Sequence, residues 1–371
     1  MTSTAVQSDA ISSIYADPAG RFTIIDPAHR RVERYLKTGP YAAALAFIKG
    51  ELAVEGDIFS AVRFFLTQRR SNIYDWWFGF CARLSSLMPQ RWTAQRNIQF
   101  HYDRSNAFYS LFLDSHMQYS EAHFERPEMS LDDAQSEKLD RICRSLQLKP
   151  GERLLDIGCG WGGLIVWAAE RYGVVAHGCT LSAQQLQFAN TLINSRGLQG
   201  RVSVDLCNYL DVNGTYEKIA SVGMFEHVGR NLPAYFRKVH SILVDGGIFL
   251  NRGIVRPQGV SDDPETLFLQ RNVFPGSQLV HLADIMREGE LAGFDVLGME
   301  EVRMHYARTC RAWVERLRAN ENACRQLVGA TTYRTWLLYL AASAVNFEAA
   351  LTGAAQVTFL KRSDFMGAHR G

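Results

Sequence analysis

An acidic residue and three closely spaced glycines lie together in LLDIGCGWGGL, residues 154–164. Asp156 ends an apolar, strand-like run, and Gly158, Gly160 and Gly162 precede a helix-like segment. Glycine allows positive φ angles and lets a ligand approach the backbone, while the amino terminus of a helix offers free N–H groups. The segment therefore predicts a turn that binds a nucleoside cofactor.

The end of the following predicted strand argues against a nicotinamide cofactor. A dinucleotide site has the pattern G-x-G-x-x-G and a carboxylate after the second strand, which holds the ribose hydroxyls. Here the second strand ends in Thr180, Leu181 and Ser182, without a carboxylate. S-adenosylmethionine (SAM) remains open as the nucleoside, although the glycine turn alone does not single it out.

A second group of candidate residues lies in GMFEHVG, residues 223–229, after the predicted fourth strand. Ligand sites in parallel sheets open at the carboxyl ends of the strands, so Glu226 and His227 are candidates for a site there. The alternative is that Glu226 is a carboxylate at a helix amino terminus, where acidic residues are favoured, with His227 as its neighbour.

The elements that must position these residues alternate between strand-like and helix-like patterns, which predicts an α/β fold with a mostly parallel sheet. A long helical insertion, residues 306–347, is expected before the last strand. Seven strands in this order are typical of a class I SAM-dependent methyltransferase, Rossmann-like, with its last strand antiparallel. The predicted strands are residues 153–157, 174–180, 202–206, 219–224, 247–251, 294–302 and 355–360.

The chain before this fold is expected to form separate units. We predict a small N-terminal α+β domain at residues 1–70, a helical linker at 71–95 and the catalytic domain at 96–371. The linker is rich in bulky apolar residues such as Trp76 and Trp77. It is interpreted as a helix that packs between domains, or as a membrane-surface element with interfacial Trp and Arg.

Composition excludes several classes of protein. The net charge of +2 is too small to argue for a nucleic-acid partner. The seven cysteines contain no CxxC pair and no cluster at zinc-ligand spacing, so we expect a reduced protein without a metal site. The first residues lack the pattern of a signal peptide, and no window predicts a membrane span. These features favour a cytoplasmic protein.

Taken together, the motifs resemble the cyclopropane-fatty-acyl-phospholipid synthase family, which includes the mycolic acid cyclopropane synthases. The resemblance extends over essentially the whole chain. Its motifs are FIKGELAVEGDIFSAVRF (47–64), HYDRSNAFYSLFLDSHMQYSEAHF (101–124), LDIGCGWGG (155–163), TLSAQQ (180–185), VGMFEHVG (222–229), VFPG (273–276) and HYARTCRAW (305–313).

The resemblance implies a set of cofactor-binding residues. Tyr119 and Ser120 would contact the methionine part of SAM, and residues of the glycine turn would form a backbone cradle. Residues after the second strand would serve the ribose, and residues after the third would flank the adenine. The full set is Tyr119, Ser120, Asp156, Gly158, Cys159, Gly160, Thr180, Leu181, Gln185, Asn208 and Tyr209.

The family's reaction places the methyl group of SAM on a cis double bond of an acyl chain, and the resulting carbocation loses a proton to a base. That base is a bicarbonate held by a Cys, a Glu, a His, an Ile and a Tyr. Glu226, Ile254 and Tyr306 match this set, whereas Glu121 stands at the Cys position and Arg252 at the His position.

These two substitutions suggest a different base. A bicarbonate ion beside two carboxylates would be repelled unless one is protonated. Arginine always carries charge and can hold a carboxylate bidentately. Our hypothesis is that Glu121 is itself the base and that Arg252 orients it. The alternative is drift in a site that still binds bicarbonate.

The resemblance implies a SAM-dependent C-methyltransferase that acts on unsaturated acyl chains of membrane phospholipids. The product would be a cyclopropane, methylene or methyl-branched fatty acid. It also implies peripheral association with the inner face of the membrane and is compatible with a homodimer. Two alternatives stay open: methylation of a soluble small molecule, and a lipid-binding relative without catalysis. An apolar tunnel lined by residues 273–291 and 306–347 would favour the acyl chain, whereas core packing of these residues would favour the soluble substrate.

Overall fold

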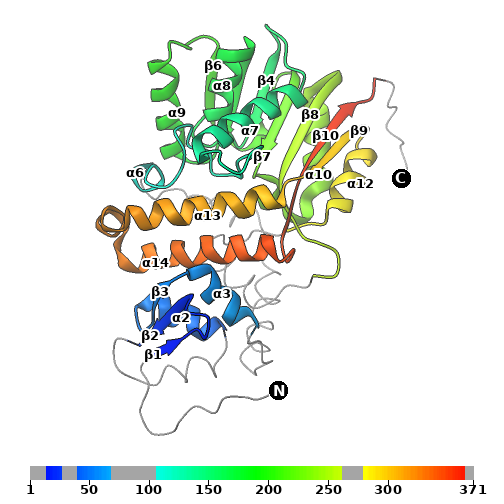
Figure 1. Ribbon diagram of the computed structural model, residues 1–371. Coiled ribbons are helices and arrows are strands. Elements are labelled where there is room, and N and C mark those ends of the chain that lie inside the picture. Colours follow the sequence, from blue (N-terminus) through cyan, green and yellow to red (C-terminus); the bar gives the residue numbers. More distant parts are fainter. Residues whose placement is uncertain (1–13, 27–39, 68–105, 261–278, 364–371) are drawn as a thin grey trace.

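The computed structural model describes residues 14–26, 40–67, 106–260 and 279–363, and these form two sheets joined by a helical hairpin (Figure 1). The larger sheet has seven strands in the order β6-β5-β4-β7-β8-β10-β9. The strands β6, β5, β4, β7 and β8 are parallel to one another, and β10 is antiparallel to its neighbours β8 and β9. This confirms the predicted class I methyltransferase fold. The strands are β4 (Arg153–Ile157), β5 (Val175–Thr180), β6 (Val202–Leu206), β7 (Tyr216–Val222), β8 (Leu243–Val255), β9 (Phe294–Glu301) and β10 (Gly353–Lys361).

Alternate residues of the strands face opposite layers of helices. Leu154 packs with helices α7 (Leu131–Ser145), α8 (Gly163–Tyr172) and α9 (Ala183–Ser195) on one face. Leu155 packs with α10 (Leu232–Ile242) and α12 (Leu282–Leu291) on the other. This period of two buries both faces of the sheet, as expected for parallel strands covered by helices.

Two predicted boundaries were wrong where the site is built. Strand β7 ends at Val222, so Gly223 and Met224 belong to the turn that follows. Strand β8 starts before the predicted 247 and continues to Val255, so Arg252 is part of the sheet. The predicted helical insertion is two helices, α13 (Arg303–Ala319) and α14 (Glu321–Glu348), and α14 is interrupted at Gly329 (φ 79°).

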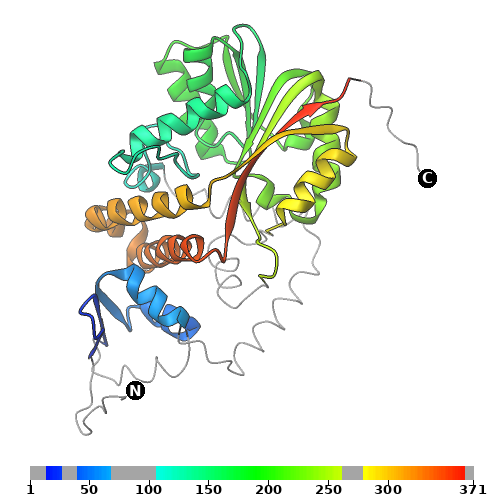
Figure 2. The same ribbon diagram turned by 45° about the vertical axis from the view of Figure 1, so that its right-hand side comes forward.

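The N-terminal unit is a three-stranded antiparallel sheet with two helices, and it has a small core of its own. Its elements are β1 (Ile14–Ala16), β2 (Phe22–Ile25), α2 (Pro40–Lys49), β3 (Ala53–Gly56) and α3 (Ile58–Thr67). The α13–α14 hairpin lies between this unit and the large sheet (Figure 2). The linker predicted at 71–95 lies outside the described residues.

None of the described helices is long and apolar enough to cross a lipid bilayer. Within the same residues, no group of His, Cys, Asp and Glu side chains is placed to hold a metal ion.

Candidate active site

A cavity opens at the carboxyl ends of β4, β5 and β7, and all the residues predicted to bind the cofactor line it. They come from the segment before α7, the glycine turn, the start of α9 and the turn after β6. They are Tyr119, Ser120, Asp156, Gly158, Cys159, Gly160, Thr180, Leu181, Gln185, Asn208 and Tyr209. The structure thus brings the whole predicted set together.

The glycine turn presents bare backbone to this cavity. Gly158, Gly160 and Gly162 have φ angles of 79°, 55° and 86°, which side-chain-bearing residues rarely adopt. A Cβ atom on Gly160 would have no protein atom within 4 Å, and the same holds for Gly223, which also lines the cavity. A ligand can therefore approach the main chain at both glycines, which fits a nucleoside cofactor.

Polar groups after the carboxyl ends of β5 and β6 are held in fixed orientations by hydrogen bonds. The Thr180 hydroxyl donates to Gln185 Oε1 at 2.6 Å, and Ser182 caps α9 by accepting from Gln185 N. This leaves the Gln185 NH₂ group as the donor. Asn208 Oδ1 accepts from Leu210 N at 3.0 Å, which fixes the turn that carries Tyr209. Burial raises the pKa of Asp156 to about 7.

Helix α7 holds the segment that carries Tyr119 and Ser120, through two residues that the sequence analysis missed. Lys138 Nζ donates to Ser120 Oγ at 2.9 Å and to Gln118 Oε1 at 2.8 Å, and Gln135 Nε2 donates to the Ser120 carbonyl at 2.9 Å. Both side chains are fully buried. The sequence does contain a sign of this role. Gln135 and Lys138 occupy the apolar stripe of an amphipathic helix, where a polar side chain is unusual unless a buried hydrogen-bond partner compensates it.

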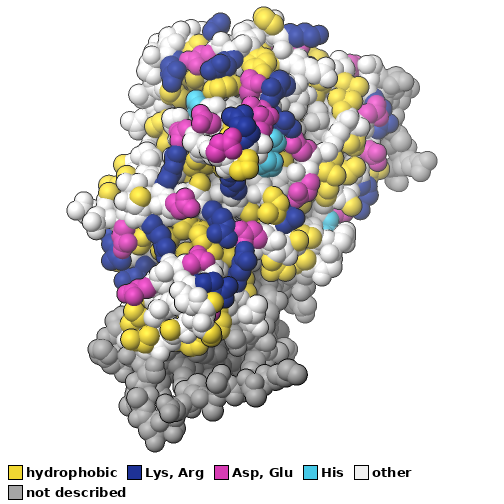
Figure 3. Space-filling view, viewed as in Figure 1, with side chains coloured by type: hydrophobic (Ala, Val, Ile, Leu, Met, Phe, Trp, Pro, Cys, Tyr) yellow, Lys and Arg dark blue, Asp and Glu magenta, His cyan; other side chains and the backbone are white. Residues whose placement is uncertain are grey.

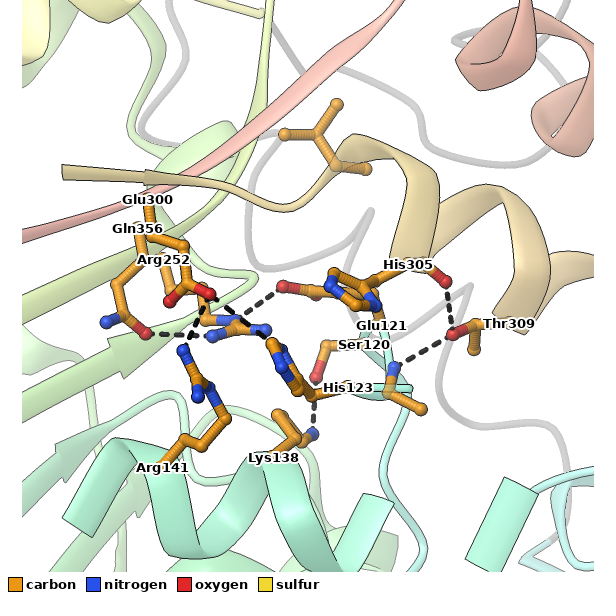
Figure 4. Close-up of polar contacts among 12 residues, drawn as sticks. Ser120, Glu121, His123, Lys138, Arg141, Arg252, Glu300, His305, Thr309 and Gln356 are labelled. Carbon is orange, nitrogen blue, oxygen red and sulfur yellow. Dashed lines mark hydrogen bonds and ion pairs between the residues drawn. The ribbon is translucent and has the colours of Figure 1, made fainter. Parts of the chain in front are cut away.

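Glu121 and Arg252 form a buried ion pair behind Ser120 (Figure 4). Arg252 Nε donates to Glu121 Oε1 at 2.5 Å, and Arg252 Nη1 donates to Gln356 Oε1 at 2.8 Å. The contact is one hydrogen bond and not the bidentate pair that the sequence suggested, because Gln356 takes part of the guanidinium. Glu121 Oε2 has no hydrogen-bond partner in the part of the chain that the structure describes.

Glu226 is a second buried carboxylate, and it is held by the backbone of β8. Glu226 lies in the first turn of the 3-10 helix Phe225–His227, as the alternative supposed, but its Oε1 accepts from Ile254 N at 2.7 Å. A Cβ atom on Gly253 would lie 2.6 Å from Glu226 Oε1, so this contact requires glycine there. Burial, with a smaller effect of the Glu121 charge, raises the pKa of Glu226 to about 7.

Tyr306, near the start of α13, completes the group. Its ring stacks on Phe347 with centroids 4.5 Å apart. Burial and the charges of Glu121 and Glu226 hold the pKa of Tyr306 well above 10, so its hydroxyl remains a donor. None of Glu121, Glu226, Arg252, Ile254 and Tyr306 lines the cavity itself. Ser120 and His227, which directly adjoin the two glutamates in sequence, do line it.

No residue of α13 or α14 lines the cofactor cavity. The described hairpin residues pack mainly as core, which is the outcome that favours the soluble-substrate alternative. A separate apolar cavity lies between α14 and the N-terminal unit, and its lining includes Leu338 and Ala342.

Trp313 and Trp336 are buried in a core that also contains Phe108 and Phe112, and Tyr119 lies against Trp313 with ring centroids 5.2 Å apart. Phe274 and its neighbours lie outside the described residues. The helical hairpin therefore forms an aromatic wall behind Tyr119.

Comparisons with known proteins agree with this geometry. A model of the family described as "Mycolic acid cyclopropane synthetase" matches residues 90–357. The "Probable fatty acid methyltransferase" of Pseudomonas putida is 38% identical over 325 residues, covering 82% of this chain and 78% of that protein. The structure of the cyclopropane synthase MmaA2 from Mycobacterium tuberculosis has a TM-score of 0.70 and 30% identity, and the match covers 72% of this chain and 98% of that one.

A further solved structure concerns the cofactor. The mycolic acid cyclopropane synthase CmaA1, in complex with SAH and CTAB, has a TM-score of 0.68 and 31% identity, and the match covers 72% of this chain and 98% of that one. SAH is the demethylated form of SAM.

Proposed function

The chain belongs to the mycolic acid cyclopropane synthetase family and is a SAM-dependent methyltransferase, and from this we propose that it methylates cis double bonds in the unsaturated acyl chains of membrane phospholipids. When bound, SAM supplies an electrophilic methyl group. Its nucleoside and methionine parts would be held by the cavity residues between Tyr119 and Tyr209.

The observation that carries the proposal is the buried pair of Glu121 and Arg252. Methylation of an alkene leaves a positive charge on the neighbouring carbon, and the reaction ends when a proton is removed. Glu121 Oε2 is an acceptor without a partner among the described residues, while Arg252 fixes the other oxygen. A carboxylate placed in this way can take the proton, so the base would be part of the protein.

Glu226 and Tyr306 would limit the negative charge next to Glu121, because both can carry a proton at neutral pH. With a pKa of about 7, Glu226 carries a proton in part of the molecules at neutral pH, which reduces its repulsion of Glu121. The Tyr306 hydroxyl stays protonated. A bicarbonate ion at the same place would add a further negative charge beside two buried carboxylates, and this favours Glu121 as the base.

The product depends on when the proton leaves. Loss of a proton from the added methyl group, with closure of the new bond, gives a cyclopropane ring. Loss of that proton after a hydride shift along the chain leaves a methylene branch. The test is to incubate the protein with SAM and vesicles of a dioleoyl phospholipid, and to analyse the fatty acids for one added CH₂ group. Mild hydrogenation leaves the ring and converts the methylene into a methyl branch.

Glu121→Gln is the variant that tests the base. We expect its turnover to fall by about 100-fold or more, the usual contribution of a positioned general base. Removal of bicarbonate should leave the wild type active. Glu125→Gln, an exposed glutamate in the same segment, is the matched control. Full turnover of Glu121→Gln, or loss of wild-type activity without bicarbonate, would overturn the proposed base, and unchanged lipid would direct attention to a soluble substrate.

A phospholipid substrate requires contact with the membrane surface, so we extend the proposal to peripheral association with the inner face of the cytoplasmic membrane. Co-sedimentation with anionic and zwitterionic vesicles measures that contact. Sedimentation equilibrium of the free protein measures whether it forms a homodimer.

A further inference from the structure

Lys138 is a fully buried cation whose hydrogen-bond partners among the described residues are uncharged. It lies in the middle of α7, and its Nζ donates to Ser120 Oγ (Figure 4) and to Gln118 Oε1. Lysine is almost never fully buried unless an anion pairs with it. Among the described residues no carboxylate forms an ion pair with Lys138, and Glu121, Asp114 and Asp156 act on it only over longer distances.

The hydrogen bond from Lys138 determines what Ser120 can do. An ammonium group has only hydrogens to offer, so Ser120 Oγ must be the acceptor in this contact. The single hydroxyl hydrogen of Ser120 is then left to donate elsewhere, and no acceptor for it is found in the described part of the chain. Gln135 fixes the carbonyl of the same residue. Ser120 lines the cavity and is therefore held as a hydrogen-bond donor toward a ligand.

The Ser120 hydroxyl, with the Lys138 ammonium group next to it, favours an anionic acceptor. SAM carries a sulfonium, an ammonium and a carboxylate, and of these only the carboxylate can accept from the Ser120 hydroxyl. We propose that Lys138 is a positioning residue for the cofactor's carboxylate, because it turns Ser120 into a donor and places a positive charge behind it. The methionine end of the cofactor then lies against α7, and the nucleoside end lies toward Asn208 and Tyr209.

This inference rests on the cofactor and is independent of the proposed lipid substrate and of Glu121 as the base. It can be tested by binding alone. Titration calorimetry with SAH measures the complete ligand, and methylthioadenosine measures a ligand that lacks the amino-acid part. Lys138→Met removes the charge but keeps much of the side-chain volume.

We expect Lys138→Met to weaken SAH about tenfold or more, as for loss of a charge-assisted hydrogen bond. Methylthioadenosine should bind within about twofold of the wild type, because it has no carboxylate. Lys218→Met is the matched control, since Lys218 is also buried, contacts Glu152 at 3.8 Å and lies outside the cavity wall. Its affinity for both ligands should be unchanged.

Ser120→Ala tests the same hydrogen bond if Lys138→Met does not fold. It should weaken SAH and spare methylthioadenosine, and in the double variant the two losses should not add. Equal weakening of both ligands by either variant would show that α7 merely supports the cavity. Unchanged SAH affinity in either would also overturn the proposal.

Discussion

At the scale of single residues, the buried carboxylates of Glu121 and Glu226 differ in the groups that compensate their negative charge. Glu121 faces the guanidinium of Arg252, whereas Glu226 accepts from the backbone N–H of Ile254 and has no cation as a partner in the described part of the chain. Burial therefore raises the pKa of Glu226 from an ordinary 4.5 to about 7. The sequence could identify both positions, because each follows a recognisable motif. It could not predict their protonation, since that depends on burial and on the backbone of a distant strand.

The raised pKa of Glu226 predicts a pH-dependent cost to stability. Between pH 4.5 and 7 the folded protein binds more protons at this site than the unfolded chain does, so the free energy of unfolding falls as pH rises through this range. The cost is absent below the unfolded pKa and complete above the folded one, at up to about 3 kcal/mol. Glu226→Gln should therefore gain stability over the wild type between pH 5 and pH 8.

Urea unfolding of both proteins across this pH range measures the difference. Glu125→Gln, which is exposed, serves as the reference and should follow the wild type at every pH. Parallel pH profiles of the wild type and Glu226→Gln would contradict the prediction.

At the scale of elements, the register of the sheet brings together the partners of Arg252. Arg252 on β8 is opposite Gln356 on β10, and Gln356 is opposite Glu300 on β9. Helix α7 covers this row, with Arg141 donating to Glu300 at 2.8 Å. The sequence predicted these strands but ended β8 too early. A charged residue argues against a buried strand, and its pairing with Glu121 and Gln356, both far away in the chain, makes Arg252 acceptable there.

Gln356→Leu should disturb the proposed base, Glu121, through Arg252. The guanidinium would lose its second partner and rotate, so we expect turnover to fall about tenfold while the KM for SAM stays unchanged, with about 1–3 kcal/mol lost in stability. The ratio of ring to methylene product should also change. Thr358→Val, on the same strand, is the control. Normal turnover and product ratio in Gln356→Leu would show that the register does not position the base.

At the scale of the whole molecule, the α13–α14 hairpin connects the two sheets. Glu348 at the end of α14 accepts hydrogen bonds from Arg311 on α13 and from Arg63 on α3. Lys and Arg side chains, interspersed with acidic ones, are visible over this part of the surface (Figure 3). The sequence predicted separate N-terminal and catalytic units and a helical insertion. It could not predict that the insertion lies between them, because an apolar helix face does not specify its partner.

Glu348→Gln should weaken the attachment of the N-terminal unit. Burial opposes ionisation of Glu348, but the hydrogen bonds from Arg311 and Arg63 lower its pKa. Because Arg63 is largely exposed, we expect a modest loss of about 1 kcal/mol. Limited proteolysis should then cut between the units sooner, with Glu315→Gln as an exposed control. Equal cleavage rates in the two variants would contradict this.

The contacts of Arg252 also have a consequence for the order in which the chain becomes an enzyme. Its partner Glu121 is made early during synthesis, whereas Gln356 belongs to β10, the last strand among the described residues. Until β10 has been made, the guanidinium of Arg252 lacks one of its two partners. If Glu121 is the base, as proposed, the residues that line the cofactor cavity are therefore complete in the chain before the residues that position the base.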